Sequence, residues 1–516
     1  MQNIKQSLIE EINKRVQDKI LEPTNAALLT KLINNAESSE EAINIAALGT
    51  TYKRTGLHFD KRLEKMKDSI KYFKKNEELS FRTNDAKPVN KLIIGDNYQA
   101  LQNLLIQYKG QIDVIYIDPP YGKDSMGEFA KTNYTNAITR DNLLSMLYPR
   151  LILAKQLLSD EGVIFCSIDD KNQAYVKCLF DEVFGEENSE GQIHWRRRHN
   201  QPNDKTKMIG IVAEHILAFS KNREAHKSFG IGKIGLTGKF SNPDNDPKGD
   251  WASKPWKVGS SQGGCKYIIE APNGQKFDEV WMGEQATFEK FLEEGRIYFP
   301  KAGDGIFGPP RKKYYKSERE EEGQCATNWW THENFGCNQD ATDELKNIFF
   351  NDCPFDNPKP VKLIKSLIQL GSINRNSLIL DFFAGSGTTG HAVLDLNKSD
   401  GGNRTFILCQ INEKTEENPK GIAYDVTSKR LKRIMTGECY DGTKDFPWLK
   451  DNEPYGGNLD VYEIESVANF ENTRGQTPFD VIDETLYGKE KFKTVKEKID
   501  WVCSNFEKTQ KALIEE

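Results

Sequence analysis

Short apolar runs alternate with longer amphipathic stretches in two separate parts of the chain. In the first part, apolar runs bounded by polar residues occupy 91–96, 113–118, 162–168 and 215–220, and a helical pattern covers about 141–158. In the second part, strand-like runs at 377–381 and 405–410 alternate with helical patterns at 361–370 and 388–396. This alternation is typical of α/β sheets. It predicts one sheet that is assembled from both parts of the chain.

The regions around these two parts have a different texture. Helical 3.6-residue spacing predicts helices over residues 1–85, and weak periodicity with many turn residues predicts an inserted domain between the two parts. A final helical pattern runs through Val495, Ile499, Val502 and Phe506. The predicted organisation is a helical extension, a first sheet half, an insert, a second sheet half and an acidic C-terminal interaction region, at 1–85, 86–222, 223–355, 356–440 and 441–516.

Composition adds size and an uneven charge to this picture. With 516 residues, the chain exceeds what one hydrophobic core usually supports. The net charge is −6, but residues 194–239 carry ten Lys/Arg against three Asp/Glu, whereas residues 451–516 carry eight against fifteen. This asymmetry favours a basic groove for nucleic acid and an acidic tail for protein contacts.

Cysteine spacing and hydropathy exclude several classes of protein. The nine cysteines stand singly, without the paired spacing of a zinc ribbon or a disulfide framework. Nowhere do eighteen apolar residues follow one another, and the first fifteen residues are rich in charge. We therefore expect a soluble, cytoplasmic protein with no membrane contact and no metal.

A glycine turn between a predicted strand and a predicted helix marks a cofactor site. The sequence reads Asp381-Phe-Phe-Ala-Gly385-Ser-Gly387-Thr-Thr-Gly390. Such a turn lets the backbone approach a ligand closely at a helix N-terminus. It also fits a nicotinamide or flavin enzyme, and the absence of Gly-Lys-Ser/Thr excludes a phosphate-binding P-loop. The motif predicts a nucleotide-type cofactor without choosing which one.

The sequence Asp118-Pro119-Pro120-Tyr121 follows another predicted strand, at the end where α/β sheets bind ligands. The exocyclic amine of a base such as adenine is a poor nucleophile, because its lone pair is delocalised into the ring. The Asp118 carboxylate and a backbone carbonyl fixed by proline can accept the two amine hydrogens and stabilise the charge that develops on nitrogen. Tyr121 offers a ring on which an extruded base can stack. These four residues are the predicted catalytic motif.

This chemistry needs no metal and no covalent nucleophile. Methylation of cytosine C5 would require a cysteine nucleophile, usually in a Pro-Cys pair, and this chain has only the reversed Cys353-Pro354.

Two basic segments in and beside the predicted insert interleave cations with aromatic residues, which suits phosphates and unstacked bases. We expect DNA contacts from Trp195, Arg196, Arg197, Arg198, Arg311, Lys312 and Lys313. Trp329 and Trp330 are expected in the core of the insert.

Taken together, these blocks resemble the amino-methyltransferases of restriction-modification systems, in the β-type order with Asp-Pro-Pro-Tyr ahead of the cofactor loop. The similarity extends over about 90–222 and 355–415 and includes Leu92-Ile-Ile-Gly-Asp-Asn97, Glu214-His-Ile-Leu-Ala-Phe-Ser-Lys-Asn222 and Asn357-Pro-Lys-Pro360. It is greatest to the modification (Mod) subunits of type III systems. The resemblance implies an α/β, circularly permuted Rossmann-like class I methyltransferase fold with an inserted target-recognition domain and a helical N-terminal extension.

The resemblance also implies a reaction. S-adenosyl-L-methionine would donate a methyl group to N6 of a flipped adenine in duplex DNA. Adenine is favoured over cytosine N4, since relatives that act on cytosine commonly have Ser at the position of Asp118. The implied partners are double-stranded DNA, a second copy of the chain and a restriction helicase-nuclease. The alternatives are a solitary or type II amino-methyltransferase acting on adenine N6 or cytosine N4, an RNA or protein amide methyltransferase, and a DNA-recognition subunit without catalysis.

The family pattern also assigns cofactor contacts. The methionine part would meet the glycine loop, its carboxylate would lie near Lys359, and the adenine near Asp96. Where many relatives hold the ribose with an acidic residue this chain has Gln410, so Gln410 or Glu413 is expected to make that contact. The whole predicted set is Asp96, Lys359, Asp381, Phe383, Ala384, Gly385, Ser386, Gly387, Thr388, Gln410 and Glu413.

Overall fold

A computed structural model describes residues 2–17, 21, 23–48, 69–120, 139–200, 206, 208–259, 263–301, 303, 305–468 and 477–507. The chain divides into two compact units, residues 1–59 and 60–516. The first unit contains three helices, α1 (Gln2–Gln17), α2 (Pro23–Asn35) and α3 (Ser39–Leu48). Their apolar stripes meet in a small core of Ile12, Ala26, Ile33, Ala36, Ala42 and Ala46, as the 3.6-residue spacing predicts.

The second unit is built on one mixed sheet of ten strands in the order β1-β15-β2-β14-β13-β3-β4-β6-β5-β12. The bounds are β1 (Ser69–Lys75), β2 (Val89–Ile94), β3 (Ile112–Ile117), β4 (Leu158–Ile168), β5 (Ser189–Arg196), β6 (Ala213–Ser220), β12 (Trp329–Trp330), β13 (Leu378–Asp381), β14 (Thr405–Gln410) and β15 (Asn458–Ala468). The run from β15 to β4 is parallel, and β6 lies antiparallel between β4 and β5. The strands β13 and β14, which come late in the sequence, lie between the early strands β2 and β3. The prediction of one sheet in permuted order is confirmed.

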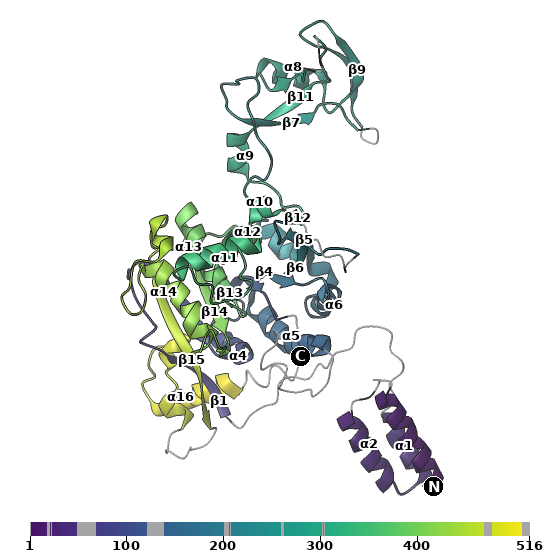
Figure 1. Ribbon diagram of the computed structural model, residues 1–516, viewed down its shortest axis with the longest axis vertical. Helices are drawn as coiled ribbons and strands as arrows, with labels where there is room; N and C mark the ends of the chain where they lie inside the picture. The colour runs from purple at the N-terminus through teal and green to yellow at the C-terminus, as the bar shows by residue number, and fades with distance from the viewer. Residues whose placement is uncertain are drawn as a thin grey trace. The chain divides into compact units, whose positions relative to one another are not determined.

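Helices cover both faces of this sheet. One face carries α11 (Asn338–Ile348), α12 (Val361–Gly371), α13 (Thr388–Asp400) and α14 (Lys429–Thr436), and the other carries α4 (Asn97–Tyr108), α5 (Thr139–Leu157) and α6 (Gln173–Phe184). Figure 1 shows α13 and α14 on one side of the strands and α5 and α6 on the other. Parallel strands covered in this way are apolar on both faces, which explains the uninterrupted apolar runs in the sequence.

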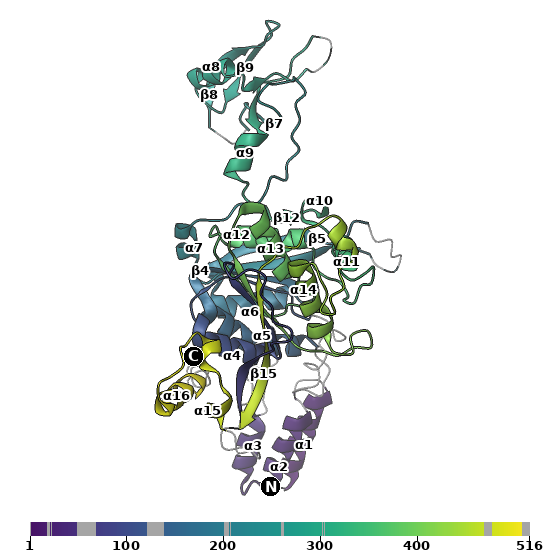
Figure 2. The same ribbon diagram turned by 90° about the vertical axis from the view of Figure 1, so that its left-hand side faces the viewer.

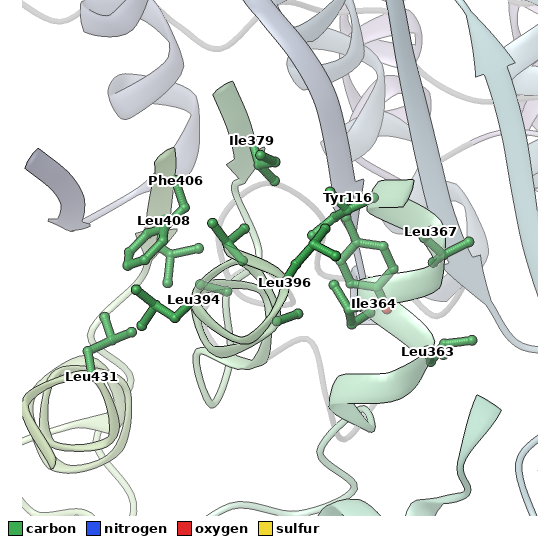
Figure 3. Packing of buried hydrophobic residues seen from close by; sticks show 14 of the residues in the cluster. Tyr116, Leu363, Ile364, Leu367, Ile379, Leu394, Leu396, Phe406, Leu408 and Leu431 are labelled. Atoms are coloured by element: carbon green, nitrogen blue, oxygen red, sulfur yellow. The ribbon is translucent and has the colours of Figure 1, made fainter. Parts of the chain in front are cut away.

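The core below α12, α13 and α14 brings together residues from both sequence parts. Side chains from the centre of the sheet, including Tyr116 and Ile379, pack against Leu363, Leu396 and Leu431 of the three helices. Figure 3 shows this contact. Each fully buried Leu or Ile contributes about 1.5–3 kcal/mol to folding. The shared core therefore fixes the two sequence halves against each other.

The inserted segment begins after α7 (Arg223–Phe229) and forms a lobe with its own elements. These are β7 (Trp251–Pro255), β8 (Cys265–Glu270), β9 (Lys276–Trp281), α8 (Gln285–Glu293), β10 (Ile297–Tyr298), β11 (Arg311–Tyr315) and α9 (Lys316–Glu322). The strands form one sheet in the order β10-β11-β7 and the β8-β9 hairpin. The lobe has a separate core that includes Trp256, Trp281, Phe288 and Phe299.

The end of the insert differs from the predicted boundary at 355. Trp330 in β12, Phe335 in α10 (His332–Phe335) and Leu345 in α11 belong to the main core. The expectation that both tryptophans sit in the core of the insert was wrong, because Trp330 of β12 is buried in the core of the main sheet and Trp329 is 52% exposed. The strand β12 has only two residues within turn-rich sequence, so the sequence pattern did not predict it.

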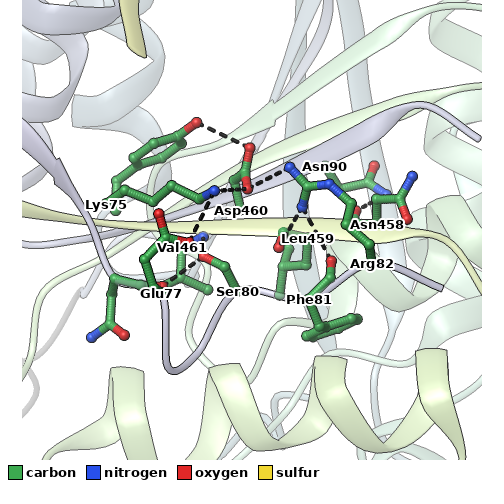
Figure 4. Close-up of polar contacts among 12 residues, drawn as sticks. Lys75, Glu77, Ser80, Phe81, Arg82, Asn90, Asn458, Leu459, Asp460 and Val461 are labelled. Atoms are coloured by element: carbon green, nitrogen blue, oxygen red, sulfur yellow. Dashed lines mark hydrogen bonds and ion pairs between the residues drawn. The ribbon is translucent and has the colours of Figure 1, made fainter. Parts of the chain in front are cut away.

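Both outer strands on the other side of the sheet also correct the predicted boundaries. Helices were expected up to residue 85 and a separate acidic region from 441, yet β1 pairs antiparallel with β15, which pairs parallel with β2. Asp460 of β15 lies 3.3 Å from Lys75 Nζ and 2.7 Å from Arg82 Nη2, and Figure 4 shows these contacts. Leu459 and Val461 on either side of it are buried. The prediction used the overall negative charge of residues 441–516 and therefore missed the alternation of polar and apolar residues in β15.

The C-terminal segment adds α15 (Pro478–Val481) and α16 (Val495–Val502). Figure 2 shows α15 beside β15, and the two elements are in contact. The predicted final helix is confirmed, with Val502 and Phe506 buried. Among the helices in the described ranges, none is both long and apolar enough to cross a bilayer.

Candidate active site

Four neighbouring parallel strands bring the predicted site residues to one edge of the sheet. The strands β2, β14, β13 and β3 lie side by side, so their carboxyl ends meet. Asp96 follows β2, Gln410 ends β14, Asp381 ends β13 and Asp118 follows β3. Ligands of open α/β sheets bind at this edge. The fold therefore joins the two motifs that stand far apart in the sequence.

The glycine loop turns twice through backbone conformations that favour glycine. Gly385 has φ +52°, and Gly387 has φ +79° where it caps the N-terminus of α13. A Cβ on Gly385 would lie 3.0 Å from the ring of Phe355. The loop is therefore a tight cradle beside a helix N-terminus, and such a cradle fits the carboxylate-bearing part of a nucleotide-type cofactor.

Gln410 holds this loop from the neighbouring strand. Its Oε1 accepts a 2.7 Å hydrogen bond from the Gly385 backbone N–H, and its Nε2 donates to the Ile411 carbonyl. Glu413 lies just beyond it on the partly exposed segment after β14. The contact of either residue with a ribose stays a prediction.

Asp381 shapes the start of the same loop. Its carboxylate accepts hydrogen bonds from the Phe383 backbone N–H at 3.0 Å and from Thr389 Oγ1 at 2.5 Å. Burial of the side chain raises the pKa of Asp381 to about 7, although these two hydrogen bonds act to lower it. The observed contacts of Asp381 are thus with the loop itself.

Arg430 of α14 supports the loop from behind, and sequence reasoning missed it. Its buried guanidinium donates to Ser386 Oγ at 3.2 Å and to Thr388 Oγ1 at 2.9 Å. The same group lies 3.3 Å from Glu344 of α11, in the segment predicted to belong to the insert. Burial lowers the pKa of Arg430, while the Glu344 carboxylate opposes this effect. The sequence signal that could have indicated a buried, functional arginine is the position of Arg430 within the apolar stripe of α14.

Asp96 belongs to a second network that the sequence did not reveal. Its carboxylate caps α4 by accepting from the Tyr98 N–H, and it lies 3.2 Å from Arg150 Nη2. Arg150 Nε also donates to Asn97 Oδ1 at 2.5 Å. Arg150 stands on the apolar face of α5, in line with Leu147, and this position was the clue.

Asp118 stands at one end of a row of charged side chains. Its Oδ2 accepts a 2.6 Å hydrogen bond from Lys359 Nζ, which also lies 2.9 Å from Glu214 Oε1. The other Glu214 oxygen is 3.5 Å from Arg197 Nη1. Pro119 is buried and Pro120 partly buried, whereas Tyr121 lies outside the described residues. Lys359, expected near the carboxylate of the cofactor, is thus bound to Asp118.

The predicted DNA-contacting residues on β5 do not all face outward. Trp195 is fully buried and donates through Nε1 to the Gly336 carbonyl, so its expected contact with DNA was wrong. Strand alternation explains this, since Ile193 and Trp195 point to the core. Arg196 is partly exposed and donates to the carbonyls of Arg198 and His199, while Arg198 is exposed.

On β11 the three predicted cations divide in the same way. Lys313 is buried and lies 2.5 Å from Asp244 and 2.6 Å from Asp246, so its expected contact with DNA was also wrong. Burial acts to raise the pKa of Asp246, but hydrogen bonds from Lys313, the Lys248 backbone N–H and Tyr315 together outweigh it and lower the pKa to about 2. Arg311 and Lys312 remain partly exposed. Lys313 therefore stabilises the lobe from inside.

Comparison of the sequence with known protein families identifies a family of enzymes that fits this site. A family model for N6- and N4-specific DNA methylases matches residues 112–420, which include both motifs and the insert between them. The chain belongs to the N6/N4 DNA methylase family. A second model, for an uncharacterised conserved protein, matches residues 5–114. The permuted strand order and the edge that carries both motifs are the fold expected of this family.

Individual relatives of this N6/N4 methylase include enzymes of two system types. The StyLTI Mod subunit, a type III restriction-modification enzyme from Salmonella typhimurium, is 33% identical over 75% of this chain, and the match spans 64% of the relative. The type II methyltransferase M.KpnI from Klebsiella pneumoniae is 28% identical over 70% of this chain and 89% of the relative. The solved PvuII DNA methyltransferase, cytosine-N4-specific, is 12% identical with a TM-score of 0.36, over 69% of this chain and 95% of that one.

Proposed function

We propose that this chain transfers a methyl group from S-adenosyl-L-methionine to N6 of a flipped adenine in duplex DNA. The observation that carries the proposal is the pairing of β13 with β3, which sets the glycine loop and Asp118-Pro119-Pro120 at adjacent strand ends. A methyl donor in the loop and an amine held at Asp118 would then meet across two neighbouring strands.

The amine is activated by acceptors that are fixed before it arrives. The Asp118 carboxylate and the Pro119 carbonyl accept hydrogen bonds from the two N–H groups of the amine. These bonds hold both hydrogens so that the nitrogen lone pair points out of the base plane toward the methyl carbon. As the nitrogen–carbon bond forms and the carbon–sulfur bond breaks, positive charge grows on nitrogen, and the carboxylate stabilises it. The sulfur keeps the electron pair of the broken bond, and the nitrogen then gives its extra proton to the Asp118 carboxylate, which passes it to water. Proline rigidity keeps the carbonyl aimed.

The residues of the loop fit the cofactor that this reaction needs. When bound, S-adenosyl-L-methionine supplies a methyl group on a positively charged sulfur. A Cβ on Gly385 or Gly387 would lie only 3.0 Å from the Phe355 ring or 3.3 Å from Thr427 Cγ2, and the turn lies at a helix N-terminus, where backbone N–H groups attract a carboxylate. Asp96 follows β2 and Gln410 ends β14, and both would hold the nucleoside part.

Substrate and partners follow from the relatives and from the exposed cations. The lobe between β7 and α9 would serve as the target-recognition domain, with Arg198, Arg311 and Lys312 on DNA phosphates. The type III Mod relative supports a role as the modification component of a type III restriction-modification system, paired with a helicase-nuclease. We further propose a homodimer, with the C-terminal region from 441 serving these protein contacts.

A second candidate is a solitary or type II amino-methyltransferase. The match to M.KpnI favours it, because that match covers 89% of the relative. Affinity purification of the chain from its own cells separates the two. Recovery of a helicase-nuclease supports the type III role, and an active enzyme without such a partner supports the solitary role.

The test of the reaction uses a methyl-labelled donor and mixed DNA, followed by digestion to nucleosides. We expect label in N6-methyladenine, and a loss of at least about 100-fold in Asp118→Ala. The matched control is Asp113→Asn, at the opposite end of β3, where the carboxylate accepts from the Leu378 N–H of β13. Label in N4-methylcytosine, or undiminished label in Asp118→Ala, would contradict the proposal.

A further inference from the structure

Glu214 lies in β6 and is almost completely buried, yet the proposed chemistry gives it no task. Its Oε1 lies 2.9 Å from Lys359 Nζ, the same ammonium that donates to Asp118 Oδ2 at 2.6 Å. Its Oε2 lies 3.5 Å from Arg197 Nη1. Asp118, Lys359, Glu214 and Arg197 come from four separate segments and form one row of alternating charge.

Stability alone is a weak reason for this arrangement. Taking a carboxylate out of water is costly, and a buried ion pair usually stabilises a fold no more than well-packed apolar side chains of the same volume. Here the partner of the buried Glu214 carboxylate is the Lys359 ammonium, and the same ammonium contacts Asp118 of the predicted catalytic motif. This position points to a task in the reaction.

Lys359 and the target amine both donate to Asp118. An ammonium with Asp118 as its sole carboxylate partner would direct its charge at that carboxylate and weaken it as an acceptor for the amine hydrogens. Glu214 draws the ammonium toward a second carboxylate, and Arg197 balances the added negative charge. Lys359 stays hydrogen-bonded to Asp118 Oδ2 at 2.6 Å and keeps that carboxylate oriented, but because it shares its charge with Glu214, less of that charge opposes the acceptance of the amine hydrogens by Asp118.

We propose that Glu214 is a positioning residue for methyl transfer, which acts through Lys359 to keep Asp118 a strong acceptor toward the target amine. This inference rests on the proposed function. A residue that binds the cofactor or DNA would change the dissociation constants. Glu214 should instead change the rate of methyl transfer, and only through Lys359.

The first test is Glu214→Gln, which keeps the shape and an oxygen that can accept from Lys359 but removes the charge. We expect kcat to fall on the order of 10- to 100-fold, with little change in the dissociation constants for S-adenosyl-L-methionine and for DNA. The matched control is Glu190→Gln, at the other end of the β5–β6 pair, where the carboxylate accepts from Ser220. That control should keep the wild-type kcat.

The second test is a double-mutant cycle with Lys359→Met. If Glu214 acts through Lys359, Glu214→Gln changes kcat no further once Lys359 is replaced. Glu214→Asp should recover part of the lost rate, and it replaces Glu214→Gln in the cycle if thermal melting shows that the glutamine variant does not fold.

Two outcomes would overturn the inference: a wild-type kcat in Glu214→Gln, or a full loss that persists in the Lys359→Met background. A wild-type enzyme that transfers no methyl group to DNA would instead overturn the proposed function. The two failures are therefore distinguishable, because the inference concerns rates relative to an active wild type.

Discussion

The side-chain amide of Asn97 donates a 2.7 Å hydrogen bond to the backbone carbonyl of Phe382. Asn97 begins α4 after β2, and Phe382 follows β13, so this bond ties the two strand ends that flank β14. Arg150 Nε holds the amide oxygen of Asn97 and thereby fixes which way the amide points. The wall of the proposed cofactor site is thus set by a buried polar network.

Replacing Asn97 with alanine should weaken cofactor binding. The change leaves the Phe382 carbonyl and one Arg150 donor without their partner, which costs roughly 1–3 kcal/mol of stability. Isothermal titration with S-adenosyl-L-methionine and thermal melting measure both effects. The matched control is Asn103→Ala, a buried asparagine on the same helix that donates to the Lys71 carbonyl. It should lose stability and keep its affinity, and equal affinities in the two variants would contradict the prediction.

Alanine at Gly385 should reduce cofactor affinity more than it reduces stability. The left-handed backbone costs a non-glycine residue about 1–2 kcal/mol, and the new methyl group also meets the Phe355 ring at 3.0 Å. Gly401→Ala is the control, since Gly401 has φ +71° but open space around it. If both variants bind the cofactor like the wild type, the loop is not the cofactor cradle.

Asp381→Asn should flatten the dependence of stability on pH. Burial raises the pKa of Asp381 to about 7, so between about pH 4 and 7 the folded chain keeps a proton that the unfolded chain releases. Through this group, stability is full at low pH and falls as pH rises toward 7, by a few kcal/mol (about 1.4 per pH unit).

Denaturant unfolding at a series of pH values measures this slope for the wild type and for Asp381→Asn. Asparagine can still accept from the Phe383 N–H through Oδ1 and can donate to Thr389 Oγ1 through Nδ2, so the difference between the two curves isolates the proton. Parallel curves over pH 4–7 would show that Asp381 is not protonated in the fold.

Neutralising Arg311 and Lys312 together should weaken DNA binding uniformly across sequences. Each lost phosphate contact lowers the slope of log K against log salt concentration by about one. Filter binding at several salt concentrations measures the slope. Lys276→Gln is the control, because Lys276 is exposed on the β8–β9 hairpin of the same lobe. An unchanged slope in the double variant would exclude these two residues from the DNA surface.

The central sheet could be predicted because its evidence is local. Parallel strands buried on both faces appear as uninterrupted apolar runs, and the ligand edge of such a sheet is always at the carboxyl ends. Asp118 and Gly385 were therefore located on one edge from sequence alone. The strands β1, β5, β12 and β15 were missed. The strand β12 has only two residues, and the other three mix charged or polar residues with apolar ones, so they leave no uninterrupted apolar run.

The sequence by itself determined the central strands of the sheet and the two predicted motifs, the glycine loop and Asp118-Pro119-Pro120-Tyr121, since each depends on a run of adjacent residues and on backbone restrictions of glycine and proline. Only the tertiary structure decided which charged and aromatic residues are inside. Trp195 and Trp329 are both tryptophans beside polar residues, yet one is buried and the other is half exposed. Lys359 meets Asp118 and Glu214 only after three segments pack together. Burial and charge pairing depend on neighbours distant in sequence, and these neighbours are set by packing.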